Sequence, residues 1–307
     1  MTSFDNSTKL FFRPQRSLGQ NFLSSDLYLK KIISACSINS NSVILEIGPG
    51  YGSLTKLLSQ TDCKKLISIE KDPNLFQWLN NNSIKWPSKV DFFLNDALEI
   101  EWDDFLKNNV SLSSDDELII VGNLPYYISN ILIGNLLEKR HLFKRLVFLV
   151  QKEVAQRWVA SPFKYKNKYS NLSIFINYSC DTELLFEIPK RFFKPIPEVD
   201  GALVILEIKI IPTENILNEN KFFLFVRNCF KFRRKTLFNN IKSFWGNEDE
   251  IKEIFKIFEY DEKIRPQDLS LDDFLKLFNN FKKTICRYIS SNSYRWLLLW
   301  ISKKWYQ

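Results

Sequence analysis

The sequence predicts an α/β protein with a mostly parallel sheet that has an antiparallel edge, followed by a small all-helical domain. Three observations support this prediction. Short apolar runs alternate with helical patterns over the first two thirds of the 307 residues. The last two apolar runs follow one another across a long loop, and beyond about residue 220 only helical patterns remain. Alternation of strand and helix is typical of right-handed βαβ units, which place their parallel strands in one sheet.

The predicted strands are rich in Ile, Val and Phe, and several are apolar on both faces, as buried parallel strands are. Five of them are separated by helical stretches: Val43–Ile47, Lys65–Glu70, Val90–Leu94, Leu118–Gly122 and Arg145–Val150. Two more, Leu172–Tyr178 and Ala202–Ile208, follow each other and predict the antiparallel edge. Helices are expected between the parallel strands at Ser53–Gln60, Pro73–Asn82 and Ile128–Lys139.

The pattern changes at Ile211–Asn220, where Pro212 and a polar stretch predict a linker. Only helices are expected beyond it: Lys221–Phe232, Thr236–Phe244, Glu248–Glu259 and Leu271–Phe281. We therefore predict one domain over residues 1–210, a helical domain over 211–283, and a C-terminal extension over 284–307.

A net charge of +8 favours a polyanionic partner, either nucleic acid or an anionic membrane surface. The alternative is that the charge only aids solubility. No apolar run approaches the roughly 20 residues that a membrane span needs, and residues 1–14 lack the pattern of a signal peptide. Scattered cysteines without a C-x-x-C pair suit free thiols in a reducing compartment, so a cytoplasmic protein is expected. They are Cys36, Cys63, Cys180, Cys229 and Cys286.

A glycine-rich turn follows the first predicted strand. Val43–Ile47 runs into Gly48-Pro49-Gly50-Tyr51-Gly52, and a predicted helix follows. Glycines allow a tight turn and the close approach of a ligand to the backbone. Glu70 ends the second strand, where a carboxylate can accept hydrogen bonds from both hydroxyls of a ribose. The pattern predicts a nucleoside-containing cofactor, and a structural turn with a chance acid is the alternative.

The spacing G-x-G-x-G, preceded by Glu46 inside the strand, resembles the first motif of class I methyltransferases. Dinucleotide dehydrogenases use the related spacing G-x-G-x-x-G. The fold expected from this resemblance is the class I, Rossmann-like methyltransferase sheet. Asp96, at the end of the third strand, is then a candidate acceptor for the adenine amino group of the cofactor. Taken alone, Asp96 is equally a candidate helix N-cap.

The fourth strand ends in Gly122-Asn123-Leu124-Pro125-Tyr126. This segment resembles [DNS]-P-P-[YF], with Leu124 in the first proline position, a motif of enzymes that methylate amino nitrogens. An adenine amino group is a poor nucleophile because its lone pair is delocalised into the ring. Two acceptors that hold its two hydrogens favour a pyramidal nitrogen, with the lone pair directed at the methyl group.

The side-chain oxygen of Asn123 and the carbonyl of Leu124 are the candidate acceptors. Pro125 restricts the backbone that carries this carbonyl, and Tyr126 is predicted to stack on a flipped base. Direct in-line transfer needs no nucleophilic side chain, so positioning is expected to supply much of the rate. The alternative is a proline-containing turn at a strand end. A dehydrogenase, which would need the other glycine spacing and a catalytic histidine, is disfavoured.

Together these motifs resemble the ribosomal RNA adenine dimethyltransferase family. The resemblance covers roughly residues 16–281 and rests on several motifs in order. They are Leu18–Leu23, Glu46–Gly50, Gly122–Tyr126, Leu149–Arg157, Phe193–Asp200, Arg233–Leu237, and Arg265-Pro266 with Leu269-Ser270.

The resemblance implies dimethylation of N6 on two adjacent adenosines in the 3′-terminal hairpin loop of small-subunit (16S) ribosomal RNA, with S-adenosylmethionine as methyl donor and no metal. It implies that the cofactor is bound by Gly48, Gly50, Glu70, Asp96 and Asn123. Asn21 and Leu23 are implied to close over the cofactor. The alternative for Asn21 is a plain residue at the entry to a helix. Phe193 matches the family aromatic residue that holds the target base against Tyr126. A role in small-subunit biogenesis, immature small subunits as partner, no membrane partner and a monomeric state are the corresponding expectations.

A basic cluster supports the RNA partner independently of the resemblance. Six basic residues and no acidic one lie between Arg227 and Lys242, and such a cluster neutralises phosphates. Arg233, Arg234 and Lys235 are the candidate RNA-binding residues, with a merely solvated charged face as the alternative. For the extension after residue 284, a helix against the domain, an RNA contact and an unstructured segment remain open.

Two departures from the family pattern lie outside the methyl-transfer loop. Phe238 stands where a polar or basic residue is common, and Gly201 replaces a usual serine. One rival function is that of the related enzymes that methylate large-subunit RNA, which typically have Ile at the position of Leu124 and lack the Gln-Lys-Glu-Val run. The other is a non-catalytic RNA-binding or assembly factor, against which the complete Asn-Leu-Pro-Tyr loop argues.

Overall fold

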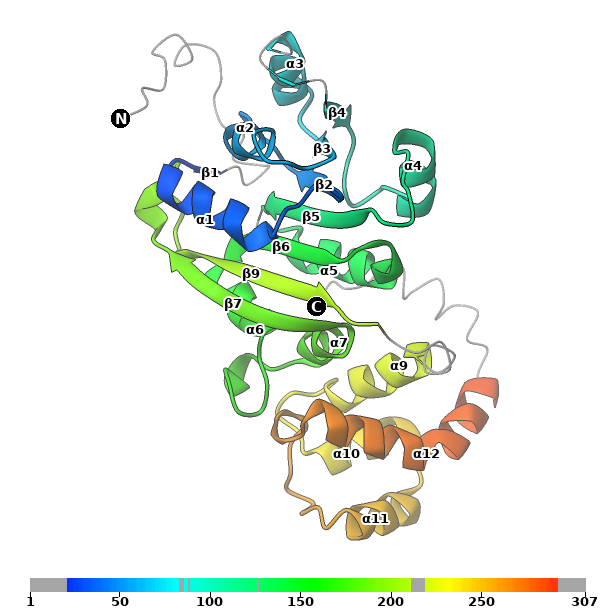
Figure 1. The fold of residues 1–307 in the computed structure, drawn as a ribbon. Coiled ribbons are helices and arrows are strands. Elements are labelled where there is room, and N and C mark those ends of the chain that lie inside the picture. The colour runs from blue at the N-terminus through cyan, green and yellow to red at the C-terminus, as the bar shows by residue number, and fades with distance from the viewer. Residues whose placement is uncertain (1–20, 83–85, 88, 126, 211–218, 292–307) are drawn as a thin grey trace. The chain divides into compact units, whose positions relative to one another are not determined.

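The computed structural model describes residues 21–82, 86–87, 89–125, 127–210 and 219–291. Its central feature is a seven-stranded mixed sheet with the strand order β4-β3-β2-β5-β6-β9-β7 (Figure 1). Five strands pair in parallel: β2 Ser42–Ile47, β3 Lys65–Glu70, β4 Val90–Leu94, β5 Glu117–Asn123 and β6 Arg145–Gln151. The remaining two are β7 Cys180–Ile188 and β9 Gly201–Ile208, which form the antiparallel edge.

The register of the parallel strands brings their carboxyl ends to one edge of the sheet. Ile47 pairs with both Ile69 and Gly122, so the chain leaves β2 beside the ends of β3 and β5. Glu70 pairs with Leu94 in the same way at the ends of β3 and β4. In open α/β sheets, ligands bind in the crevice outside these carboxyl ends.

The three helices that the sequence predicts between the parallel strands are present, with small differences at their ends: α2 Ser53–Leu58, α3 Pro73–Asn81 and α5 Ser129–Glu138. The same part of the chain also forms α1 Asp26–Cys36, α4 Trp102–Asn109, α6 Lys152–Trp158 and α7 Asn171–Ser179. All six residues of β2 are buried, as expected for a central parallel strand covered on both faces. A separate antiparallel pair joins β1 Phe22–Leu23 to β8 Phe193–Lys194.

The prediction of a strand at Leu172–Tyr178 is wrong, because these residues belong to helix α7. Ser170 and Ser173 form a capping box at its start, which fixes a helical first turn. Six of the nine residues of α7 are buried and none is exposed, so the segment has no solvent-exposed polar face and lacks a helical period. A short apolar run of this kind cannot be distinguished from a buried strand by its pattern. The strand of this region is β7, which begins directly after the helix.

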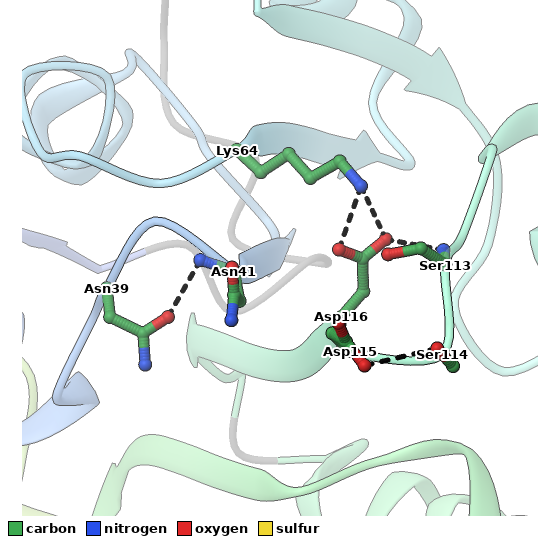
Figure 2. A network of polar contacts seen from close by, with 7 residues as sticks. All are labelled: Asn39, Asn41, Lys64, Ser113, Ser114, Asp115 and Asp116. Carbon is green, nitrogen blue, oxygen red and sulfur yellow. Dashed lines mark hydrogen bonds and ion pairs between the residues drawn. The ribbon is translucent and has the colours of Figure 1, made fainter.

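A polar network lies before the amino ends of β2, β3 and β5, at the edge of the sheet opposite to the carboxyl ends (Figure 2). Lys64 Nζ lies 2.7 Å from Asp116 Oδ2, and the same carboxylate oxygen accepts a hydrogen bond from the Ser113 backbone N–H at 2.7 Å. Asn39 Oδ1 accepts from the Asn41 backbone N–H at 2.8 Å. These contacts fix three connecting loops at the edge away from the predicted ligand.

The chain divides into two compact units by its internal contacts. The first contains residues within 1–132, 145–152 and 185–204, and the second contains the described residues within 133–144, 153–184 and 205–307. Four helices of the second unit are α9 Glu219–Cys229, α10 Leu237–Trp245, α11 Glu248–Ile257 and α12 Leu271–Ser291. The predicted domain boundary at residue 283 falls inside α12, whose helical backbone continues to Ser291. Residues 292–307 of the predicted extension lie outside the described residues.

The second unit has a core rich in phenylalanine. Phe225 lies 5.9 Å from Phe281 between ring centroids, and Phe238 makes an edge-to-face contact with Phe255 at 5.5 Å. Phe238 is 5% exposed, so the residue that departs from the family pattern belongs to this core and not to a phosphate-binding surface. Aromatic pairs of this geometry stabilise a core beyond the effect of their buried area.

Candidate active site

The glycine turn adopts a conformation that side chains rarely permit. Gly48 and Gly50 have φ values of 69° and 58°, in the left-handed region that favours glycine. A β-carbon on Gly50 would lie 2.6 Å from a ring carbon of Phe22. Gly50 therefore permits both the turn and the close approach of β1, which passes over it.

Glu70 is tied to this turn through its carboxylate. Its Oε2 accepts a hydrogen bond from the Gly50 backbone N–H at 3.1 Å, and its Oε1 accepts from the Asp72 N–H at 2.9 Å. The side chain is 6% exposed, and burial raises the pKa of its carboxyl, against the opposing effect of backbone hydrogen bonds from Asp72, Gly50 and Lys71.

Glu46 is buried beneath the turn, at 1% exposure. Its Oε2 accepts hydrogen bonds from the hydroxyls of Thr55, at 2.6 Å, and Ser68, at 2.7 Å. Desolvation raises the pKa of the Glu46 carboxyl to about 7, although the two hydroxyls act in the opposite direction. This side chain links β2, β3 and α2 below the glycine turn.

Asp96 follows β4, and it is not the N-cap of a helix, because the next helix, α4, begins at Trp102 with Glu101 in the N-cap position. Its Oδ1 accepts from the Leu98 backbone N–H at 3.0 Å, in the turn that follows β4. Its Oδ2 forms an ion pair with Lys71 at 2.5 Å, and the residue lines the same cavity as Glu70. Lys71 is a site residue that the sequence reasoning missed, and its position directly after Glu70 is the signal that could have identified it.

The Asn123 amide has a defined orientation at the end of β5. Its Nδ2 donates to the Asn21 backbone carbonyl at 2.7 Å, which leaves Oδ1 as the acceptor of this side chain. The next residue, Leu124, is held by a bond from its N–H to the Leu149 carbonyl at 2.9 Å. Tyr126, the predicted base-stacking residue of this loop, lies outside the described residues.

Phe193 reaches the site through the pairing of β1 with β8, in which Leu23 lies opposite Phe193. The Phe193 ring is 3% exposed and packs closely on Gly201, where a β-carbon would meet the ring at 2.9 Å. Gly201 is the second departure from the family pattern, and its lack of a side chain leaves room for the Phe193 ring. The sequence predicts that this ring lies beside the target base.

Most of the predicted site residues of the first unit line one cavity. Its empty volume is about 920 Å³, part of which is open to solvent. Apart from Leu23 and Tyr126, every residue predicted to bind the cofactor or take part in transfer lines it: Asn21, Gly48, Gly50, Glu70, Asp96, Asn123, Leu124, Pro125 and Phe193. Leu23 lines a second cavity of about 460 Å³, which shares Phe22, Gly48, Asn123 and Leu149 with the first. Tyr127, which was not predicted, lines the larger cavity and is 51% exposed.

The predicted RNA-binding residues Arg233, Arg234 and Lys235 are exposed in the second unit, in the loop between α9 and α10. Asn240, which is fully buried, fixes this loop: its Oδ1 accepts from the Phe232 N–H at 2.9 Å, and its Nδ2 donates to the Phe232 carbonyl at 3.1 Å. Sequence reasoning missed Asn240, because nothing in the local pattern distinguishes it from its exposed neighbour Asn239.

No helix among the described residues combines the length and apolar character required to cross a membrane. Within the same residues, no cluster of three or more His, Cys, Asp or Glu side chains is placed to hold a metal ion.

Comparison with known proteins identifies the family of this chain. The family model described as ribosomal RNA adenine dimethylase matches residues 11–283. The ribosomal RNA small subunit methyltransferase A of Mesoplasma florum is 32% identical over 265 residues, which cover 86% of this chain and 97% of that protein. Its counterparts in Fusobacterium nucleatum and Clostridium botulinum are each 34% identical, cover 88% of this chain, and are matched over 98% and 94% of their length.

Among solved structures, a dimethyladenosine transferase from Plasmodium falciparum is similar with a TM-score of 0.68 and 27% identity, over 86% of this chain and 98% of that one. The 23S rRNA methyltransferase ErmE shares the fold, with a TM-score of 0.65 at 20% identity, over 85% of this chain and 99% of that one. The chain therefore belongs to the ribosomal RNA adenine dimethylase family, of the small subunit methyltransferase A type, and it is an S-adenosylmethionine-dependent ribosomal RNA adenine dimethyltransferase.

Proposed function

We propose that this protein transfers methyl groups from S-adenosylmethionine to N6 of two adjacent adenosines in the 3′-terminal hairpin loop of small-subunit (16S) ribosomal RNA, two to each adenosine. The proposed setting is the biogenesis of the small subunit in the cytoplasm, with the immature subunit as partner. The small-subunit enzymes among the relatives support this substrate, and they are aligned with this chain over nearly their whole length.

The residues at the carboxyl ends of the strands fit the methyl donor. The Glu70 carboxylate lies beside Gly50 and lines the cavity, which suits an acceptor for the ribose hydroxyls. Asp96 lies one strand further along the sheet and would accept from the adenine amino group. Asn21 and Leu23 would close over the ligand from β1. When bound, the methyl donor supplies an electrophilic methyl group on a sulfonium cation.

The observation that carries the proposed chemistry is the orientation of the Asn123 amide. Because Nδ2 donates to the Asn21 carbonyl, Oδ1 is the atom left to accept a hydrogen from the target amine. The Leu124 carbonyl would accept the second hydrogen, and Pro125 limits the backbone rotation that would move it. With both hydrogens held, the nitrogen lone pair is directed away from the adenine ring, toward the methyl group.

Base holding is proposed for Tyr126 and Phe193, and RNA binding for Arg233, Arg234 and Lys235. The exposure of the three basic residues on a loop fixed by Asn240 supports their assignment. We propose that residues 1–210 form the catalytic domain, residues 211–283 the helical RNA-binding domain and residues 284–307 an extension. We also propose that the enzyme acts as a monomer and without a metal ion.

Labelled methyl transfer tests the proposed substrate. Unmodified small subunits and unmodified large subunits are incubated separately with the protein and labelled S-adenosylmethionine. The proposal predicts saturation at two methyl groups on each of two adenosines per small subunit, and no label on large subunits. Label on large subunits alone would instead assign the function of the large-subunit enzymes. Tight subunit binding without label would indicate an assembly factor without chemistry.

A further inference from the structure

The second unit carries an aromatic side chain on its surface that no part of the proposed catalytic machinery uses. Phe163 is 93% exposed, in a loop of residues 161–168 between α6 and α7, which we call the Phe163 loop. Both ends of the loop are anchored, because Ala160 and Tyr169 are buried in the phenylalanine-rich core. A large apolar ring left in water contributes no burial energy to the fold.

The backbone holds Phe163 outward in a closed turn. The Ser161 N–H donates to the Lys164 carbonyl at 2.8 Å, and the Lys164 N–H returns a bond to the Ser161 carbonyl at 3.3 Å. The Ser161 hydroxyl oxygen accepts from the N–H groups of Phe163, at 3.3 Å, and Lys164, at 3.1 Å. Pro162 further restricts the turn. An aromatic side chain on such a turn is arranged for binding before its partner arrives, which lowers the entropy cost of contact.

The Phe163 loop is linked to the basic loop of residues 231–235 within the same unit. Lys166 forms an ion pair with Asp268 at 2.5 Å, and the short helices η5 (Lys166–Lys168) and η7 (Pro266–Asp268) are in contact. From η7, Gln267 Nε2 donates to the Arg233 carbonyl at 3.4 Å. These contacts join the two loops into one surface region.

Both loops carry exposed basic and aromatic side chains. Lys164 is exposed beside Phe163, and Lys231, Arg233, Arg234 and Lys235 are exposed on the basic loop. A second partly exposed ring, Phe232, has the ammonium groups of Lys231 and Lys235 at 5.4 Å and 4.3 Å from its centroid. Cations match phosphates, while a protruding ring among them matches an unpaired base, whose face stacks on aromatic side chains.

We propose that the Phe163 loop and the basic loop form one RNA-binding surface, in which Phe163 stacks on an unpaired base of small-subunit ribosomal RNA. This inference rests on the proposed substrate, and it adds a contact made in the second unit, separate from the target adenosine. The basic residues set the electrostatic part of the affinity, while Phe163 contributes a part that does not depend on salt.

Binding of protein-free small-subunit RNA, measured across a salt series, tests the proposal. Phe163→Ala is expected to weaken binding by about 5-fold to 150-fold, the range typical of one stacked base, with the slope of log K against log salt unchanged. Phe163→Trp should bind as the wild type does, and Phe163→Leu should resemble Phe163→Ala, since leucine is apolar but cannot stack. Ile257→Ala, which removes another exposed apolar side chain of this unit, at 62% exposure, is the matched control and should have no effect.

An unchanged affinity of Phe163→Ala would overturn the proposal. Full binding by Phe163→Leu would also overturn it, because the contact would then be apolar without stacking. If Phe163→Ala weakened binding to intact subunits but not to protein-free RNA, Phe163 would contact a ribosomal protein and not a base. That result would also contradict the proposal. Methyl transfer by the wild type is measured separately, so a failure of the proposed function is distinguishable from a failure of the stacking contact.

Discussion

Replacing Asn123 by alanine removes the acceptor that is proposed to hold the target amine. The substitution also deletes the hydrogen bond from Asn123 Nδ2 to the Asn21 carbonyl, which spans 2.7 Å. Loss of that bond is expected to cost about 0.5–1.5 kcal/mol of stability. Loss of one oriented hydrogen-bonding group that acts in the transition state typically costs about 10²–10³ in rate. Asn123→Ala should therefore fold, and its transfer rate should fall by a factor in that range.

Single-turnover transfer of labelled methyl groups to unmodified small subunits, at saturating cofactor, is the assay. Binding of S-adenosylmethionine by the variant is measured in parallel, so that a rate effect is separated from a loss of cofactor. Asn109→Ala is the matched control, because Asn109 Nδ2 also donates to a backbone carbonyl, that of Phe105 at 2.9 Å, in helix α4. It should lose a similar amount of stability and keep its transfer rate. Near-normal transfer by Asn123→Ala with bound cofactor would refute the proposed role of this residue.

Three further predictions concern buried and charged groups. Because burial raises the pKa of Glu46 from 4.5 to about 7, the folded state retains a proton that the unfolded chain releases, so the contribution of this carboxyl to stability is fully present below pH 4.5 and is lost as the pH rises through 7. Glu46→Gln should remove this pH-dependent loss, so that above pH 7 the variant is more stable than the wild type by about 3 kcal/mol. Denaturant unfolding across pH measures the difference, and the same pH dependence of the unfolding free energy in both proteins would contradict the prediction. Asn240→Ala should lower stability by about 1–3 kcal/mol and weaken RNA binding, because the two hydrogen bonds from the Asn240 side chain to the Phe232 backbone are lost. Asn239 is exposed, so Asn239→Ala should change neither stability nor RNA binding. Arg233→Glu with Arg234→Glu should weaken subunit binding and reduce the salt slope by about 2, and an unchanged slope would remove both residues from the RNA surface.

The parallel part of the sheet could be predicted from the sequence, because its strands are short apolar runs separated by helical patterns. Lys65–Glu70 and Val90–Leu94 have the predicted bounds, and the antiparallel edge is confirmed. The error at Leu172–Tyr178 has a physical cause. A helix that is buried on almost all sides presents no polar face, so only its serine capping box distinguishes it from a strand.

The candidate site was predictable where residues follow one another at strand ends, as Glu70 and Asn123 do, because parallel strands bring these ends together. Contacts between distant segments were not predictable in detail. The Asn21 carbonyl that orients Asn123 lies 102 residues away in sequence, and its pairing depends on β1 crossing the glycine turn. Asn240 was missed for a related reason, since its burial in the second unit depends on tertiary packing and not on local pattern.

The loop of residues 122–126 is proposed to dimethylate two neighbouring adenosines of small-subunit RNA. Nucleotide-resolved mapping of N6-dimethyladenosine on small subunits, after reaction with the wild type and, separately, with Asn123→Ala, tests this directly. Dimethyladenosine is expected at two adjacent positions in the 3′-terminal hairpin loop with the wild type, and strongly reduced modification at both with the variant. Modification at other positions, or equal modification by the two proteins, would contradict it.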